Sequence, residues 1–232
     1  MILNYTALAS DLLKWKLPSA LIALSAVPVV AGTVRLTGLA RGPISPENIR
    51  FFAAPLPISL HILSAICFCI LGAFQFSAEL RRLFPRSHRL SGRIASPCGI
   101  VAGASGVWMT ATYPLYPIFQ GALLYSSRIV FGMAMVVAIS LALTAIRRRD
   151  IPTHHDWMIR AYAIGQGAGT QVLITLPFML LLGGVSGLLR DSLMCAGWLI
   201  NVALAEWIIR KRRWRRIPRC SEKESQSNVG LI

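Results

Sequence analysis

Acidic residues are scarce in this chain: 9 of its 232 residues are aspartate or glutamate, against 24 lysines and arginines. So few carboxylates argue against a hydrolase that works through paired acids. The sequence has no phosphate-binding glycine loop, no His-Glu-x-x-His zinc motif and no Gly-x-Ser-x-Gly nucleophile elbow. Its five cysteines lie mostly within apolar stretches and lack the spacing of a metal site or a disulfide framework. These absences argue against the soluble enzyme classes that such motifs identify.

The composition places the chain in a lipid bilayer. Hydrophobic residues make up 55% of it, charged residues only 14%, and the mean hydropathy is +0.59; a soluble domain has a far more polar composition. The formal net charge of +15 does not indicate a nucleic-acid partner, because the basic residues separate apolar runs and form no basic soluble face. Membrane lipids are the expected surroundings.

Six apolar runs are each long enough to cross a hydrocarbon core of roughly 30 Å. They predict an all-α, polytopic membrane helix bundle of six transmembrane helices within residues 17–209. The predicted spans one to six cover residues 17–39, 53–76, 90–113, 123–146, 157–183 and 192–209. Residues 1–16 place apolar side chains on one helical face and predict an interfacial N-terminal segment. Residues 210–232 predict a basic and then disordered cytoplasmic tail.

The lysines and arginines divide unequally between the two sides of the predicted bundle. Two lie near the N-terminus, five in residues 81–93, four in residues 147–160 and eight after residue 209, all on one side. The other side has Arg35, Arg41, Arg50, Arg128 and Arg190. By the positive-inside rule this asymmetry predicts that both termini are cytoplasmic, N-in and C-in. The expected location is the inner (plasma) membrane of a bacterium.

A stripe of small residues marks span three. From His88, alternate steps of four and three residues reach Gly92, Ser96, Gly99, Gly103, Gly106 and Thr110. Such stripes let helices approach closely within a membrane. A second stripe of small residues begins at His154 and follows span five. We therefore expect spans three and five to pack directly against each other, with both histidines at the cytoplasmic end.

The cytoplasmic ends of these two spans form the best candidate site. Its predicted members are His88, His154, His155, Arg89, Arg93 and Arg160. One hypothesis is a membrane electron-transfer protein, similar in logic to cytochrome b561, in which His88 and His154 ligate haem b and the arginines hold its propionates. The same two histidines are the predicted metal ligands. An acidic headgroup would instead bind their charged rings.

His61 and Arg128 form a separate polar cluster. His61 lies about eight residues into span two, too far along the helix to join the cytoplasmic histidines. Because ionisable residues in a membrane usually face an interior, His61 and Arg128 are expected to point inward in the other half of the bundle. They favour a second hypothesis, a transporter or lipid-interacting protein with a small-molecule ligand. The sequence shows neither the inverted repeat nor the broken helix that would support it.

A third hypothesis is a scaffold whose histidines and arginines cap helices and contact headgroups. Its partner would be another membrane protein or a second copy of the chain. The sequence leaves all three hypotheses open.

Three segments of the chain carry a family resemblance. They are Leu60-His61 followed by Gly72-Ala73-Phe74-Gln75-Phe76, then His88-Arg89-Leu90-Ser91-Gly92-Arg93, then His154-His155-Asp156-Trp157-Met158-Ile159-Arg160-Ala161-Tyr162. In this order and spacing they resemble the DUF2306 family of membrane proteins. The resemblance covers about residues 55–175. It implies a multi-span helical protein whose histidines recur in the family, and it implies no activity.

Overall fold

The structure, a computed structural model, describes residues 5–46, 48–114 and 121–214, and for residues 5–14 only the course of the helix. The described part is helical apart from short connections and contains no strand. Its helices are α1 (Tyr5–Arg41), α2 (Ile49–Ala53), α3 (Pro55–Gln75), α4 (Ala78–Leu83), α5 (Pro85–Thr112), α6 (Ala122–Arg147), α7 (Ile151–Gly165), α8 (Gly167–Leu182) and α9 (Gly187–Trp214). Six stretches of these residues are long and apolar enough to cross a membrane. The predicted all-α membrane bundle is confirmed.

The first span belongs to one long helix. α1 runs from Tyr5 to Arg41 with Pro18 and Pro28 inside it, and the part that can cross a membrane is Trp15–Arg41. The residues predicted as an interfacial segment therefore continue into the first span. At the other end of the chain α9 extends to Trp214, and the rest of the predicted tail lies outside the described residues. The orientation in the membrane stays a prediction.

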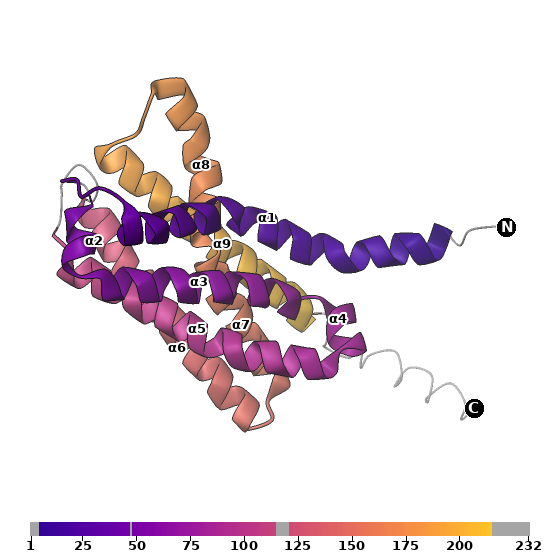
Figure 1. The fold of residues 1–232 in the computed structure, drawn as a ribbon. Helices are drawn as coiled ribbons and strands as arrows, with labels where there is room; N and C mark the ends of the chain where they lie inside the picture. Colours follow the sequence, from indigo (N-terminus) through magenta and orange to yellow (C-terminus); the bar gives the residue numbers. More distant parts are fainter. Residues whose placement is uncertain (1–4, 47, 115–120, 215–232) are drawn as a thin grey trace, which may run out of the picture.

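Span five differs most from its predicted form. The stretch Ile151–Leu182 consists of two helices, α7 and α8, joined at Gln166 (Figure 1). Glycines flank the junction because large side chains occupy the adjacent space: Phe68 lies against Gly165, and the indole of Trp198 lies against Gly167. The interruption is a single residue with right-handed helical backbone angles, and the sequence analysis did not predict it.

The core of the bundle surrounds Phe68 of α3, which is 1% exposed. Its ring contacts Gly99 of α5 on one side and Gly165 of α7 on the other, and its centroid lies 5.6 Å from that of Tyr162. α5 packs against α3 and α6, whereas α7 packs mainly against α6 and α9. The prediction that spans three and five pack directly against each other is therefore wrong. Phe68 and Met135 fill the space beside Gly165 instead.

The small residues of α5 nevertheless face other helices, as their stripe predicts. A Cβ atom at Gly99 would lie 2.5 Å from Cδ1 of Ile139, and one at Gly103 would lie 2.9 Å from Cγ2 of Val136, both on α6. Only glycine fits at such distances. The stripe therefore sets how closely α5 approaches α3 and α6.

The bundle has two ends, which we name by their short helices (Figure 1). The α2 end has α2, the start of α6 and the connection from α8 to α9. The α4 end has α4, the connection from α6 to α7 and the last turn of α9. Each end holds one of the two predicted polar clusters.

Candidate functional site

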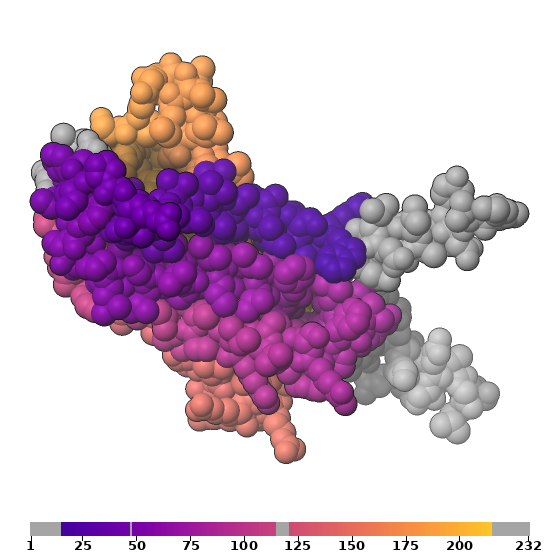
Figure 2. All heavy atoms as spheres, viewed as in Figure 1, coloured from indigo at the N-terminus to yellow at the C-terminus, as the bar shows by residue number. Residues whose placement is uncertain are grey.

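A cavity of about 970 Å³ lies between α1, α3, α5, α6, α8 and α9 in the half of the bundle nearer α2. Much of its lining is apolar and includes Ile58, Ile62, Phe68, Met135 and Trp198. Figure 2 shows that the surface is hollowed between α1 and the tip formed by α8 and α9. Residues of α1, α8 and α9 line the cavity. The cavity is large enough for a small organic molecule.

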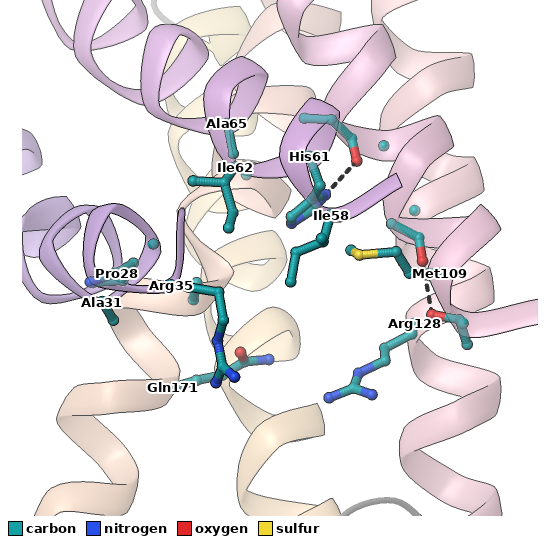
Figure 3. Close-up of a pocket in the computed structure, with 18 of the residues that line it drawn as sticks. Pro28, Ala31, Arg35, Ile58, His61, Ile62, Ala65, Met109, Arg128 and Gln171 are labelled. Carbon is teal, nitrogen blue, oxygen red and sulfur yellow. Dashed lines mark hydrogen bonds between the residues drawn. The ribbon is translucent and has the colours of Figure 1, made fainter. Parts of the chain in front are cut away.

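Four arginines line this cavity: Arg35 from α1, Arg50 from α2, Arg128 from α6 and Arg190 from α9. In Figure 3 the guanidinium groups of Arg35 and Arg128 lie on the same side of the cavity as the Gln171 amide. Those of Arg35 and Arg50 both contact the ring of Phe51, with their central carbons 4.9 and 4.7 Å from its centroid. One aromatic face thus helps hold two positive charges close together.

His61 faces the same cavity from α3. Its Nδ1 lies 2.9 Å from the carbonyl oxygen of Ala102 in α5, a hydrogen bond that places the proton on Nδ1 (Figure 3). The ring can lie this close to α5 because Gly106 opposes it. With Nδ1 as the donor, Nε2 is the ring nitrogen that can accept a hydrogen bond. His61 and Arg128 therefore line one cavity.

Asp191 of α9 anchors the start of α6 beside the cavity. Its carboxylate is 3% exposed and accepts hydrogen bonds from the amides of Leu124, at 3.2 Å, and Gly121, at 3.4 Å. The unsatisfied amides and the dipole at a helix N-terminus stabilise a negative charge there. This contact fixes the positions of Arg190, next to Asp191 in the chain, and Arg128, one turn after Leu124.

The break between α7 and α8 forms the part of the lining farthest from α2. Gln166 is buried there: its Oε1 accepts from the Ser25 hydroxyl at 2.9 Å, and its Nε2 donates to the Tyr162 hydroxyl at 2.7 Å. The Tyr162 hydroxyl in turn donates to the carbonyl of Cys69 at 2.7 Å. The backbone of Gln166 keeps right-handed helical angles, so the junction is a one-residue irregularity in the span. Such irregularities are tolerated within a membrane where they are buried in protein or line a cavity. Both conditions hold at Gln166.

The predicted histidine cluster lies at the α4 end, where His88, His154 and His155 are all partly buried. His155 lies between two arginines: Nη1 of Arg81 is 3.2 Å from its Nε2, and Nη1 of Arg212 is 2.6 Å from its Nδ1. Nδ1 of His154 lies 2.9 Å from the carbonyl oxygen of Ala142. The structure therefore brings two arginines to this cluster that the sequence reading did not include.

Of the three arginines predicted in this site, only Arg89 lies close to its histidines. Arg89 is exposed but close enough to His88 to interact electrostatically with it, and Arg93 is exposed on α5. Arg160 pairs with Glu206 of α9 through two hydrogen bonds of 2.5 and 3.1 Å and stacks on Trp157 at 4.6 Å. Arg160 thus joins α7 to α9 and does not take part in the histidine cluster.

These contacts do not support the haem hypothesis. The bond from Nδ1 of His154 to a carbonyl is compatible with ligation through Nε2. However, both ring nitrogens of His155 face guanidinium groups, and Arg160, a predicted propionate partner, is held by Glu206. Within the described residues no group of three or more histidine, cysteine and acidic side chains could hold a metal ion. Ligation of haem b by His88 and His154 remains a hypothesis from the sequence alone.

The sequence reading missed most of the cavity. It placed Arg35 at the end of a span and assigned Arg50 and Arg190 to the side of the membrane with few basic residues. It did not group these arginines with Arg128 in one site. A signal was present in the count of basic residues, because four of the five arginines on this side line the cavity. The break at Gln166 also had a signal, since a polar residue stands between two glycines inside an apolar run.

The helical fold and its apolar spans define a polytopic integral membrane protein, here with an arginine-lined cavity. The chain belongs to the family described as "Predicted membrane protein (DUF2306)", whose family model matches residues 58–209. The matched range includes His61, Arg128 and Arg190 of the cavity, whereas Arg35 and Arg50 precede it. No match was found among the curated proteins or the solved structures. The family description gives a membrane location and no activity.

Proposed function

We propose that the protein binds an anionic amphiphile, a molecule with a carboxylate or phosphate group on an apolar body, in the cavity at the α2 end. The observation that carries the proposal is the convergence of four arginines on one largely apolar cavity. Guanidinium groups present several N–H donors in a planar fork that matches carboxylate and phosphate oxygens. Ionisable side chains inside a membrane are costly and usually belong to a ligand site or pathway.

The charge balance at this end favours a negative ligand. The parts of the chain that surround it contain five arginines, whereas their acidic residues in the sequence are Glu47 and Asp191. The carboxylate of Asp191 accepts hydrogen bonds from the backbone amides at the start of α6. Like charges brought together in surroundings of low dielectric constant repel one another, and a bound anion lowers that cost.

The size and lining of the cavity favour a ligand with an apolar body. A volume of about 970 Å³ far exceeds the space that a bare carboxylate or phosphate needs, and the apolar side chains would leave such an ion poorly solvated. An acyl or isoprenoid chain would instead bury its surface against Ile58, Ile62 and Met135. The hollow between α1 and the α8–α9 tip gives such a molecule a route from the bilayer (Figure 2).

The proposed location is the inner membrane of a bacterium, with the α4 end in the cytoplasm. This orientation follows from the basic residues, which are concentrated at the α4 end and near both termini. The cavity then lies in the half of the membrane away from the cytoplasm. Its small-molecule ligand would come from the outer leaflet or from the periplasmic side.

Binding of matched ligands to the purified protein in lipid nanodiscs tests the proposal. The probes are dodecyl phosphate and dodecanol, which differ only in the anionic group. We expect the phosphate to bind more tightly, and Arg128→Gln and Arg35→Gln each to weaken its binding roughly ten- to hundredfold, since a hydrogen bond to a charged group contributes about 1.5–3 kcal/mol. Dodecanol binding should change little in either variant.

Arg41→Gln is the matched control, because Arg41 ends α1 at the same end of the bundle but is exposed and does not line the cavity. This variant should bind dodecyl phosphate as the unaltered protein does. Equal binding of the two probes, or equal losses in the Arg41 and Arg128 variants, would refute the proposal.

A second candidate function, transport of the same anion, is favoured by the broken helix. Discontinuous membrane helices whose free ends face a central site are typical of secondary transporters. Gln166 and the first residues of α8 line the cavity at such a break. Proteoliposomes should then move fluorescent dodecyl phosphate across the bilayer faster than protein-free vesicles. Tight binding with no such flux would leave the protein as a binding protein.

A further inference from the structure

The arrangement around His155 at the α4 end places two positive charges against one imidazole ring. The guanidinium groups of Arg81 and Arg212 approach opposite ring nitrogens, at 3.2 and 2.6 Å. A neutral imidazole has one acceptor nitrogen, so it cannot accept a hydrogen bond from both. The electrostatic repulsion among these groups favours a negative charge between the helices that carry them, α4, α7 and α9.

His88 adds a donor without a partner to the same region. Its Nδ1 is buried and makes no hydrogen bond among the described residues, although buried polar atoms in proteins are nearly always bonded. Arg81, Arg89 and His154 all lie close enough to act on it electrostatically, and each carries or can carry a positive charge. This ring nitrogen thus lacks a hydrogen-bond partner among the described residues, in a strongly positive environment.

Two of the described carboxylates at this end are already paired. Asp156 is buried and paired with Arg213 at 2.9 Å, and Glu206 is paired with Arg160. Glu79, two residues before Arg81, has a buried Oε2 that accepts no hydrogen bond among the described residues. In addition, α5 begins in this region without a side-chain cap, and helix N-termini favour anions. Among the described residues, the α4 end therefore has more basic than acidic side chains.

We propose that Arg81, His88, His155 and Arg212, which we name the His155 cluster, form a second binding site that takes a phosphate group. These side chains come from four different helices, so their donors can converge on a tetrahedral anion from several directions. The site lies at headgroup depth: Trp207 and Trp214 of α9 are exposed at the same end, and a cytoplasmic leaflet rich in anionic lipid attracts such basic surfaces. The phosphate belongs either to a lipid headgroup or to a soluble phosphate compound.

The test measures lipid adducts of the intact protein by native mass spectrometry in detergent. The probes are dioleoyl phosphatidylglycerol and dioleoyl glycerol, which share their acyl chains and differ in the phosphate-containing headgroup. We expect Arg81→Gln and Arg212→Gln to weaken phosphatidylglycerol binding about tenfold or more, which corresponds to the loss of one hydrogen bond to a charged group. His88→Gln provides a third variant that retains side-chain size and should weaken binding in the same direction.

Arg148→Gln is the matched control, since Arg148 is an exposed arginine at the same end, outside the cluster. It should bind phosphatidylglycerol normally, and so should Arg128→Gln from the cavity at the α2 end. Thermal melting of each variant shows whether it is folded before its binding is compared. Because the two sites are tested by different variants, failure of one proposal leaves the other intact.

Competition with inorganic phosphate separates the two sources. If the ligand is a lipid headgroup, inorganic phosphate will not displace phosphatidylglycerol from the unaltered protein. If the ligand is a soluble phosphate compound, inorganic phosphate will displace phosphatidylglycerol from the unaltered protein but not from the Arg81 variant. Unchanged phosphatidylglycerol binding in folded Arg81, His88 and Arg212 variants would overturn the proposal. Equal affinity for dioleoyl glycerol would overturn it as well.

Discussion

Replacing Gly99 by alanine adds a single methyl group at a close contact of the core. That methyl carbon would lie 2.5 Å from Cδ1 of Ile139 and 2.7 Å from Cε2 of Phe68. Neither side chain has room to move: Ile139 is 0% exposed, and the far edge of the Phe68 ring rests against Gly165. The variant must therefore push α5 away from α3 and α6, or force Phe68 from its rotamer.

Overpacking of this kind costs about 1–3 kcal/mol. Thermal unfolding of the purified protein in detergent should show a clearly lower melting temperature for Gly99→Ala. Gly38→Ala is the control, because nothing lies within 4 Å of a Cβ atom at Gly38 in α1. Alanine also favours a helix over glycine by about 1 kcal/mol, so the control should melt at the same temperature or higher.

A second substitution that removes the clashing atom tests the packing more sharply. Ile139→Val removes the Cδ1 atom that the new methyl would strike, so the double variant should lose less stability than the sum of the two single variants. If Gly99→Ala melts with the unaltered protein, or if the two changes are simply additive, the packing of α5 against α3 and α6 described above is wrong.

Three further predictions concern the contacts that hold the sites. Arg160→Ala should lower the free energy of unfolding by about 1–3 kcal/mol in chemical denaturation, since it leaves partly buried Glu206 unpaired; an unaltered midpoint would exclude a role in joining α7 to α9. Asp191→Ala should cost about 1–2 kcal/mol through the lost cap of α6, and amide hydrogen exchange should rise first in residues 122–125. Exchange that rises elsewhere instead would contradict the cap. Hydrogen bonds from Thr153 lower the pKa of Asp150, so its carboxylate stabilises the start of α7 at neutral pH and loses that effect as the pH falls through the lowered value. Asp150→Asn should therefore melt lower at neutral pH, with a difference that disappears in acid; a constant difference would contradict this pKa.

The sequence was sufficient for features that depend on one helix at a time. Six apolar runs predicted six spans, and the stripe from Gly92 to Thr110 indicated which face of α5 packs against other helices. Each of these inferences uses only the helical repeat and the length of a run. The prediction that His61 and Arg128 point inward also needs only one helix at a time, because the cost of exposing such residues to lipid does not depend on their neighbours.

Features that depend on how helices are placed around one another were missed. The stripes of small residues on spans three and five suggested that these spans pack against each other. A stripe does not identify the helix that packs against it, and beside Gly165 that space is filled by Phe68 and Met135. One cavity is lined by Arg35, Arg50, Arg128 and Arg190 because α1, α2, α6 and α9 converge at one end of the bundle. The sequence of a single segment does not predict this convergence. The break at Gln166 depends in the same way on distant contacts, with Ser25 and Trp198.

Photolabelling can show whether the arginine-lined cavity holds an anionic amphiphile. A dodecyl phosphate with a photoreactive diazirine at the far end of its chain would be irradiated with the protein in nanodiscs, and the labelled peptides identified by mass spectrometry. We expect labelling of cavity-lining residues such as Phe68, Met135 and Trp198, and we expect it to fall strongly in Arg128→Gln but not in Arg41→Gln. Labelling confined to the exposed leucines of α8, at equal levels in both variants, would contradict the proposal.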